Sequence, residues 1–132
     1  MESSALVSAL LEHDPAVLGA PAGTRHVTSA LTLAEAGRAI IRARVTGRLT
    51  PADEQAAVRA LRTFERRCFI VDVDRAALAR VRRPFPIEPI RTLDAVHLAT
   101  AELLGEAPQL VTIVTRDVRV RDNARALGYA VA

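Results

Sequence analysis

The sequence predicts an α/β fold, because helical and strand-like segments alternate along one short chain. Helical periodicity is clearest in residues 31–45, where apolar side chains recur between arginines, and strand character is clearest in residues 68–73 and 110–115. Strands separated by helices in a short chain predict a parallel sheet covered on both faces. With 132 residues, of which 50% are hydrophobic, the chain can bury one sizeable core. We therefore expect a single domain spanning residues 1–132.

The remaining elements follow from the same patterns. Helices are predicted for residues 4–11, 31–45, 51–66, 74–81, 92–104 and 118–127, and strands for residues 26–29, 68–73, 110–115 and 129–131.

Capping residues and helix breakers define the ends of these elements. Thr50-Pro51 has the cap and first-turn proline of a helix start. His13-Asp14-Pro15 ends the first helix, and Gly47 and Gly128 end two later ones. Three prolines within residues 82–89 impose an extended loop.

The charge pattern permits contact with nucleic acid. The net charge is +3, and all 18 basic residues are arginines, which bind phosphate bidentately. Two groups are placed to follow a phosphate backbone: Arg38, Arg42, Arg44 and Arg48, and Arg116, Arg119, Arg121 and Arg125. The alternative is a solvated helix face in an arginine-biased composition. Aromatic residues make up only 3% of the chain, which disfavours base stacking.

The start of the chain predicts a cytoplasmic protein. Residues 1–4 lack the basic region of a signal peptide, and no apolar run approaches the ~18 residues of a membrane span. The lone Cys68 cannot form an internal disulfide and is expected to pack as a small apolar group.

Two carboxylates stand where core packing does not place them. Asp94 lies in the first turn of the largely apolar helix 92–104, and Asp117 follows the strand 110–115. Acids at a helix start and at the carboxyl end of a parallel strand converge where α/β proteins bind ligands, so the pair suggests a metal or phosphate-chemistry site. Glu35 occupies a similarly apolar stretch, although taken alone it is more typical of an exposed helical glutamate paired with Arg38 or Arg42, of which only Arg38 is a true neighbour.

Four segments occur in order along the chain: Glu2-Ser3-Ser4-Ala5-Leu6, Ser29-x-Leu31-Thr32-x-x-Glu35, the run from Arg91 to Ala101 around Asp94, and Val114-Thr115-Arg116-Asp117. In order and spacing they resemble the PIN-domain family, specifically its VapC-type toxin ribonucleases of toxin–antitoxin systems. The resemblance covers nearly the whole chain.

This resemblance implies a fold and a site. The fold is a three-layer α/β/α sandwich around a parallel sheet of about five strands. The catalytic acids fall on Glu2, Glu35, Asp94 and Asp117; Glu2, Asp94 and Asp117 are the metal ligands, and Ser4 and Thr115 are polar neighbours. Two carboxylates ~4 Å apart repel by roughly 4 kcal/mol at an effective dielectric of 20, so such a cluster needs a divalent cation, Mg²⁺ or Mn²⁺. Arg91 and Arg116 hold substrate phosphate or balance the acids.

The resemblance also implies an activity and partners. The activity is metal-dependent endoribonucleolytic cleavage, with tRNA as the expected RNA. The partners are a VapB-type antitoxin covering the acidic site and a second copy of the chain. The homodimer is also suggested by the large apolar residues Leu61, Phe64, Phe69, Ile70 and Leu78.

The chain departs from the family pattern at its start. The first acid is normally Asp, and a hydrophobic central strand normally leads into it, whereas only Met1 precedes Glu2. We therefore expect a truncated first strand. Three other residues near the site are weaker candidates: His97 is expected to be a hydrogen-bonded structural residue, and Asp122 and Asn123 to assist the metal indirectly.

Two other functions are compatible with the sequence. One is a truncated PIN module that binds antitoxin or RNA without cleaving. The other is a doubly wound phosphatase with Asp72-Val73-Asp74 as its nucleophile motif, although the further motifs of that class do not follow in order.

Overall fold

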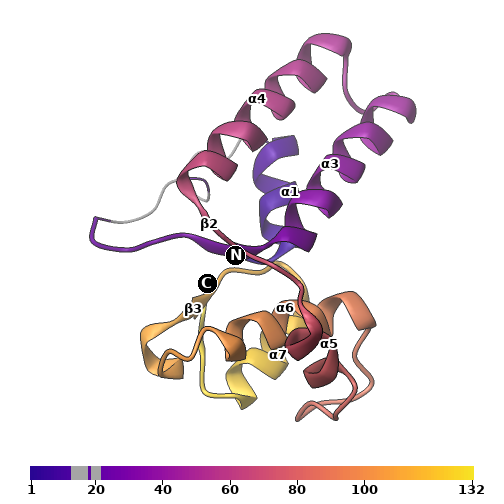
Figure 1. Ribbon diagram of the computed structural model, residues 1–132. Helices are drawn as coiled ribbons and strands as arrows, with labels where there is room; N and C mark the ends of the chain where they lie inside the picture. Colours follow the sequence, from indigo (N-terminus) through magenta and orange to yellow (C-terminus); the bar gives the residue numbers. More distant parts are fainter. Residues whose placement is uncertain (13–17, 19–21) are drawn as a thin grey trace.

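The computed structural model describes residues 1–12, 18 and 22–132. Its elements are α1 (Ser3–Glu12), β1 (Val27–Ser29), α3 (Ala30–Val45), α4 (Pro51–Arg67), β2 (Phe69–Val71), α5 (Arg75–Val81), α6 (Thr92–Leu103), the 3₁₀ turn η1 (Pro108–Leu110), β3 (Thr112–Ile113), α7 (Val118–Ala126) and β4 (Ala130–Val131) (Figure 1). The predicted alternation of helices and strands is confirmed. The strands are shorter than expected, and the helix end predicted at His13-Asp14-Pro15 lies outside the described residues.

Polar caps explain why several helices start where they do. The Thr50 hydroxyl accepts a hydrogen bond from the Asp53 backbone N–H, the Asp53 carboxylate accepts one from Thr50, and Pro51 occupies the first turn of α4. The Asp74 carboxylate caps α5 by accepting from the Ala77 N–H at 2.9 Å. Asp74 is exposed and occupied by this bond, so the structure does not support the phosphatase alternative built on it.

The strands form two separate parallel pairs. In one pair Val27 is opposite Phe69 and Ser29 opposite Val71, and in the other Thr112 is opposite Ala130. The single sheet of about five strands expected from the family is not formed by residues 1–12, 18 and 22–132.

Met1 and Glu2 lie between the two pairs. The Met1 amine donates to the Val27 carbonyl at 2.6 Å, and the Thr28 hydroxyl donates to the Met1 carbonyl at 2.6 Å. On the other side, the Glu2 N–H donates to the Val114 carbonyl at 2.9 Å. Two residues can make only these few bonds in place of a full strand ladder, which explains why the pairs are not joined into one sheet.

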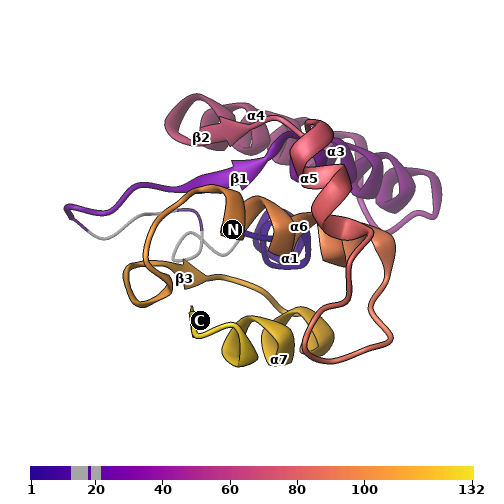
Figure 2. The same cartoon turned by 60° about the horizontal axis from the view of Figure 1, so that its bottom comes forward.

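The core is divided between two groups of helices. One cluster joins α1, α3 and α4 and contains Leu6, Leu10, Ala36, Ile40, Ala43, Leu49, Ala57 and Phe64. The other surrounds α6 and α7 and contains Phe85, Ala95, Leu98, Ala99, Ala101, Val120, Ala124 and Tyr129. Figures 1 and 2 show α3 and α4 on one side of the molecule and α7 on the other. Ser3, at the start of α1, and His97, in the middle of α6, lie between these groups, with Oγ and Nε2 3.5 Å apart.

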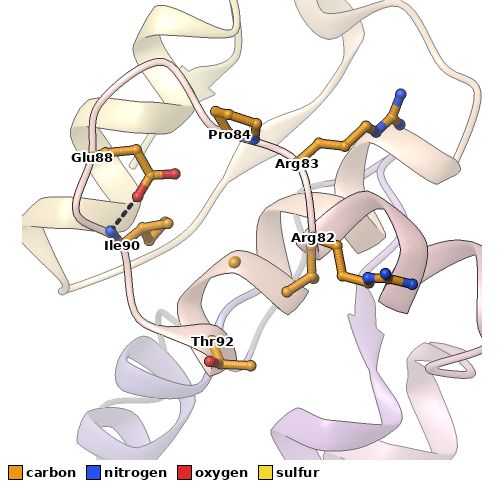
Figure 3. A pocket seen from close by; sticks show the side chains of 8 residues that line it. Arg82, Arg83, Pro84, Glu88, Ile90 and Thr92 are labelled. Carbon is orange, nitrogen blue, oxygen red and sulfur yellow. Dashed lines mark hydrogen bonds between the residues drawn. The ribbon is translucent and has the colours of Figure 1, made fainter.

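The proline-containing loop is stabilised by hydrogen bonds with one of its own side chains, Glu88, and with Asn123 on α7. The Glu88 carboxylate accepts from the Phe85 N–H at 3.0 Å and from the Ile90 N–H at 2.7 Å (Figure 3). Asn123, fully buried on α7, accepts from the Ile87 N–H and donates to the Ile87 carbonyl, both at 2.9 Å. The expectation that Asn123 assists a metal is therefore wrong, because its amide is used to clamp the loop. Asp122 instead lies beside Arg121, with Oδ1 and Nε 3.4 Å apart.

No helix in the part of the chain that the structure describes is both long and apolar enough to cross a bilayer.

Candidate active site

Glu2 is held by several donors at the start of α1. One carboxylate oxygen, Oε1, accepts from the Ser3 hydroxyl at 2.6 Å and from the Ser4 N–H at 3.0 Å. The other, Oε2, accepts from the Ser4 hydroxyl and from the Thr115 hydroxyl, the latter at 2.7 Å. The residue is only 4% exposed. Burial alone raises the pKa of Glu2, but these hydrogen bonds outweigh burial and lower it below its usual range. Glu2 is therefore held ionised inside the protein.

Ser4 and Thr115 connect Glu2 to the turn that carries Asp117. The Ser4 oxygen accepts from the Arg116 N–H at 2.8 Å and from the Asp117 N–H at 3.1 Å, and the Thr115 oxygen accepts from the Asp117 N–H at 3.1 Å. Both polar neighbours expected from the sequence are thus in contact with the site. Arg116 contributes its backbone N–H to this arrangement.

Asp117 has a second task at the start of α7. Its Oδ1 accepts from the N–H groups of Arg119 at 2.7 Å and Val120 at 3.3 Å. Both cap bonds use the same carboxylate oxygen. The cap therefore orients the Asp117 carboxylate at the carboxyl end of the segment that follows β3.

Asp94 has an environment opposite to that of Glu2. It lies in the first turn of α6, and its Oδ2 is buried without a hydrogen-bond partner in the described part of the chain. Burial raises the pKa of Asp94, and the nearby charges of Asp117 and Glu2 raise it further, while Arg91 and His97 oppose the rise. Asp94 is therefore close enough to Asp117 and to Glu2 to be repelled by both.

Glu35 reaches the site through a histidine. Its Oε2 lies 2.8 Å from His97 Nε2, which is also 3.8 Å from Glu2 Oε1 and 3.5 Å from the Ser3 hydroxyl. Burial raises the pKa of Glu35, but the hydrogen bonds from His97 and Ser3 outweigh it, so the pKa is lowered. The position of His97 one turn after Asp94 indicates that it could touch the site, although a hydrogen-bonded structural role is the favoured prediction. The structure shows that one of its hydrogen bonds is made to the predicted site itself, where the ring lies between Glu35 and Glu2.

The donor set fits a divalent cation. All three predicted ligands, Glu2, Asp94 and Asp117, offer carboxylate oxygens, which suit Mg²⁺ or Mn²⁺. The buried Asp94 oxygen lacks the partner that a cation would supply. Among residues 1–12, 18 and 22–132, no three His, Cys, Asp or Glu side chains are gathered closely enough to hold an ion as they stand. The structure therefore presents separated ligands in place of a closed cage.

A surface cavity of about 300 Å³ beside the proline loop is separate from these acids. It is lined by Val81, Arg82, Arg83, Pro84, Glu88, Ile90, Thr92 and Ala95 (Figure 3). None of the four predicted acids lines it, so this cavity is not the acidic site.

Carboxylates at a helix start and after a strand are typical of α/β proteins that bind ligands at this edge of the fold, and comparison with known families identifies the family. The PIN domain model matches residues 2–126, so the chain belongs to the PIN domain family. The predicted family membership is confirmed.

Two curated relatives show the same relationship. Ribonuclease VapC46 of Mycobacterium tuberculosis (strain ATCC 25618 / H37Rv) is 38% identical over 134 residues, covering 99% of this chain and 93% of the relative. Ribonuclease VapC35 of the same strain is 37% identical over 107 residues, covering 81% of this chain and 71% of the relative. No solved structure matches the chain at a significant level.

Proposed function

We propose that this protein is a metal-dependent endoribonuclease, the toxin of a toxin–antitoxin pair, acting as a single PIN domain over residues 1–132. The observation that carries the proposal is Asp94, which has one buried oxygen without a partner in the described part of the chain and a pKa raised by burial and by the charges of Asp117 and Glu2. It is supported by two PIN-family relatives that are named ribonucleases.

Glu2, Asp94 and Asp117 would hold Mg²⁺ or Mn²⁺, which supplies charge stabilisation for the phosphate and makes a water more acidic. The hydroxyls of Ser4 and Thr115 keep Glu2 ionised and in place. The cap of α7 orients Asp117. Glu35 remains ionised beside His97, which suits it to accept a proton from water as the RNA strand is cut.

RNA is the substrate that the charge distribution favours. The chain has no lysine, and the helices that carry or follow Glu35 and Asp117, α3 and α7, also bear exposed arginines. A compact acidic site must approach one scissile phosphate closely, which favours the accessible single-stranded loop of a structured RNA such as tRNA. Binding through phosphates is expected to weaken steeply as salt is raised, and an RNA affinity that does not change with salt would contradict this mode of binding.

The proposed partners are a VapB-type antitoxin and a second copy of the chain, with the pair acting in the cytoplasm. The antitoxin would place an arginine among the carboxylates near Glu35 and Asp94. For the homodimer, Phe69 is 60% and Leu78 50% exposed, so both are available to an interface. Phe64, also expected there, is instead buried in the core. Scattering at high micromolar concentration tests the dimer, and a monomer would refute it.

The nuclease assignment is tested with Asp94→Asn. This change removes one proposed ligand, so metal-dependent cleavage of RNA should fall by at least about 100-fold, the scale of losing one group that stabilises transition-state charge. Asp122→Asn is the matched control, because Asp122 is a partly exposed acid on α7 that pairs with Arg121. Cleavage is measured with a tRNA substrate at several Mn²⁺ concentrations.

Undiminished cleavage by Asp94→Asn would refute the site. No cleavage by the unchanged chain, together with retained binding of RNA, would favour the non-cleaving module instead.

A further inference from the structure

His97 lies at the meeting point of the two groups of helices. It projects from α6 and is 8% exposed, and its ring contacts residues at the start of α1 and at the start of α3. On one side, Nε2 faces Glu35 Oε2 at 2.8 Å. On the other, Nδ1 is 3.4 Å from both the Ser29 hydroxyl and the Thr32 hydroxyl. The ring therefore has polar partners at both nitrogens.

These partners determine which nitrogen carries a proton. An ionised carboxylate can only accept hydrogen bonds, so Nε2 donates to Glu35. Nδ1 faces hydroxyls, which can donate or accept as needed. Ser29 also caps α3 by accepting from the Thr32 N–H at 3.3 Å. The two hydroxyls that face Nδ1 are therefore held in place by the start of a helix.

The two α3 side chains that the ring contacts, Thr32 at Nδ1 and Glu35 at Nε2, lie on one face of the helix. Thr32 and Glu35 are three residues apart on α3, which makes them neighbours on its surface. The histidine therefore spans one turn of α3, resting on Thr32 and reaching Glu35. Its Nε2 is also 3.8 Å from Glu2 Oε1, so the ring stands between two carboxylates that repel each other.

We propose that His97 is a positioning residue for the acidic site, fixing Glu35 beside Glu2 through Nε2 while Ser29 and Thr32 fix the ring. This inference rests on the proposed nuclease function and adds a role for a residue that does not itself hold the cation. Without the ring, the partly exposed Glu35 side chain loses its hydrogen-bond donor while it is still repelled by Glu2, and it would turn away from the site.

Two amide substitutions distinguish positioning from packing. In His97→Gln the side-chain amide reaches the place of Nε2, whereas in His97→Asn it reaches only the place of Nδ1. Both variants keep a polar group in the same buried position. The proposal requires that His97→Gln retain most of the function and that His97→Asn and His97→Leu lose it.

Mn²⁺ affinity of the intact protein, followed by electron paramagnetic resonance, is the first readout. Glu35 is not one of the three proposed ligands, but His97 holds it beside the ligand Glu2. Losing an outer partner of a metal site typically costs 10- to 100-fold in metal affinity, so we expect about a tenfold weaker Kd for His97→Leu and His97→Asn. The second readout is RNA cleavage, in which kcat should fall while KM changes little. In a protein that already carries Glu35→Gln, adding His97→Leu should change the Mn²⁺ Kd less than about twofold, because its target is gone.

Thr100→Val is the matched control, because Thr100 is buried on α6 and its hydroxyl donates within the helix to the Val96 carbonyl at 2.8 Å. It should bind Mn²⁺ and cleave like the unchanged chain. The inference is overturned if His97→Gln and His97→Asn behave alike, or if His97→Leu weakens Mn²⁺ binding equally with and without Glu35→Gln. If the unchanged chain binds no Mn²⁺, the proposed function fails, and the metal-site role of His97 fails with it.

Discussion

Glu2 is a buried carboxylate and Asp94 a half-buried one, and the two have opposite surroundings. Glu2 receives donors from Ser3, Ser4 and Thr115 and has a lowered pKa, because these bonds outweigh the effect of burial. Asp94 has one buried oxygen without a partner, and burial together with neighbouring acids raises its pKa. One acid is stabilised by the protein itself, whereas the other lacks a stabilising partner.

The difference indicates how the site divides its tasks. The donors around Glu2 fix a negative charge before any ligand arrives, and this fixed charge contributes to the strain on Asp94. In the proposed function, a cation at these residues would relieve that strain, so Asp94 would contribute binding free energy while Glu2 and Asp117 are already held in place. The contrast between the two acids can be tested through stability as well as through activity.

The largest expected effect concerns the backbone that places Glu2. The Met1 amine is buried and donates to the Val27 carbonyl, and burial lowers its pKa, although electrostatic interactions with Cys68 and Glu2 oppose the fall. Adding about five apolar, β-branched residues before Met1 replaces this charged amine by an amide and permits further ladder bonds, each worth about 1 kcal/mol. We expect a higher melting temperature and faster metal-dependent cleavage.

Thermal melts and cleavage rates of the original and extended chains check this prediction. An extension of the same length rich in Gly and Ser is the control, since it converts the amine to an amide without strand propensity. Equal melting temperature and equal activity in all three proteins would show that the position of Glu2 does not depend on such a strand.

A smaller effect with opposite signs is expected from neutralising each acid in the absence of metal. Glu2→Gln loses charge-assisted hydrogen bonds and should lower the free energy of unfolding by about 1–3 kcal/mol. Asp94→Asn removes a buried charge that is repelled by Glu2 and Asp117, so it should leave stability unchanged or raise it. Urea denaturation with a chelator present measures both. If the two changes lowered the free energy of unfolding equally, the proposed difference between the surroundings of Glu2 and Asp94 would be wrong.

Much of this architecture was predictable because it depends on local sequence. The cap at Thr50-Pro51 and the glycine at Gly128 act within a few residues, and the structure confirms the helices that they delimit. The Asp117 backbone N–H donates to Ser4 and to Thr115. The resemblance to the family predicts that these two hydroxyls lie near the acids, because the matching segments occur in the family's order along the chain.

The parts that escaped prediction depend on contacts between distant residues. His97 and Glu35 are separated by 62 positions, and Asn123 and Ile87 by 36, so no local pattern links either pair. The division of the strands into two pairs likewise depends on how few bonds Met1 and Glu2 make across the gap. Polar side chains such as Asn123 are easily assigned to a nearby site when their true partner is backbone in a remote loop.

The smallest expected effect is the dependence of metal-free stability on pH. Glu2 has a folded-state pKa below its ordinary value of 4.5, so it stabilises the fold above that value, and this contribution is lost as the pH falls through the folded-state pKa. Asp94 has a folded-state pKa above its ordinary value of 3.8, so the folded state binds the extra proton and is destabilised as the pH rises through that window. The two slopes partly cancel on the acid side of neutrality. Glu2→Gln should therefore flatten the loss of stability below about pH 4.5, whereas Asp94→Asn should steepen it. Urea midpoints of the unchanged chain and of both variants, measured from about pH 3 to pH 6, where carboxyl groups titrate, check this prediction. If the midpoints of the two variants changed equally with pH, Glu2 and Asp94 would not have the opposite pKa shifts that their surroundings predict.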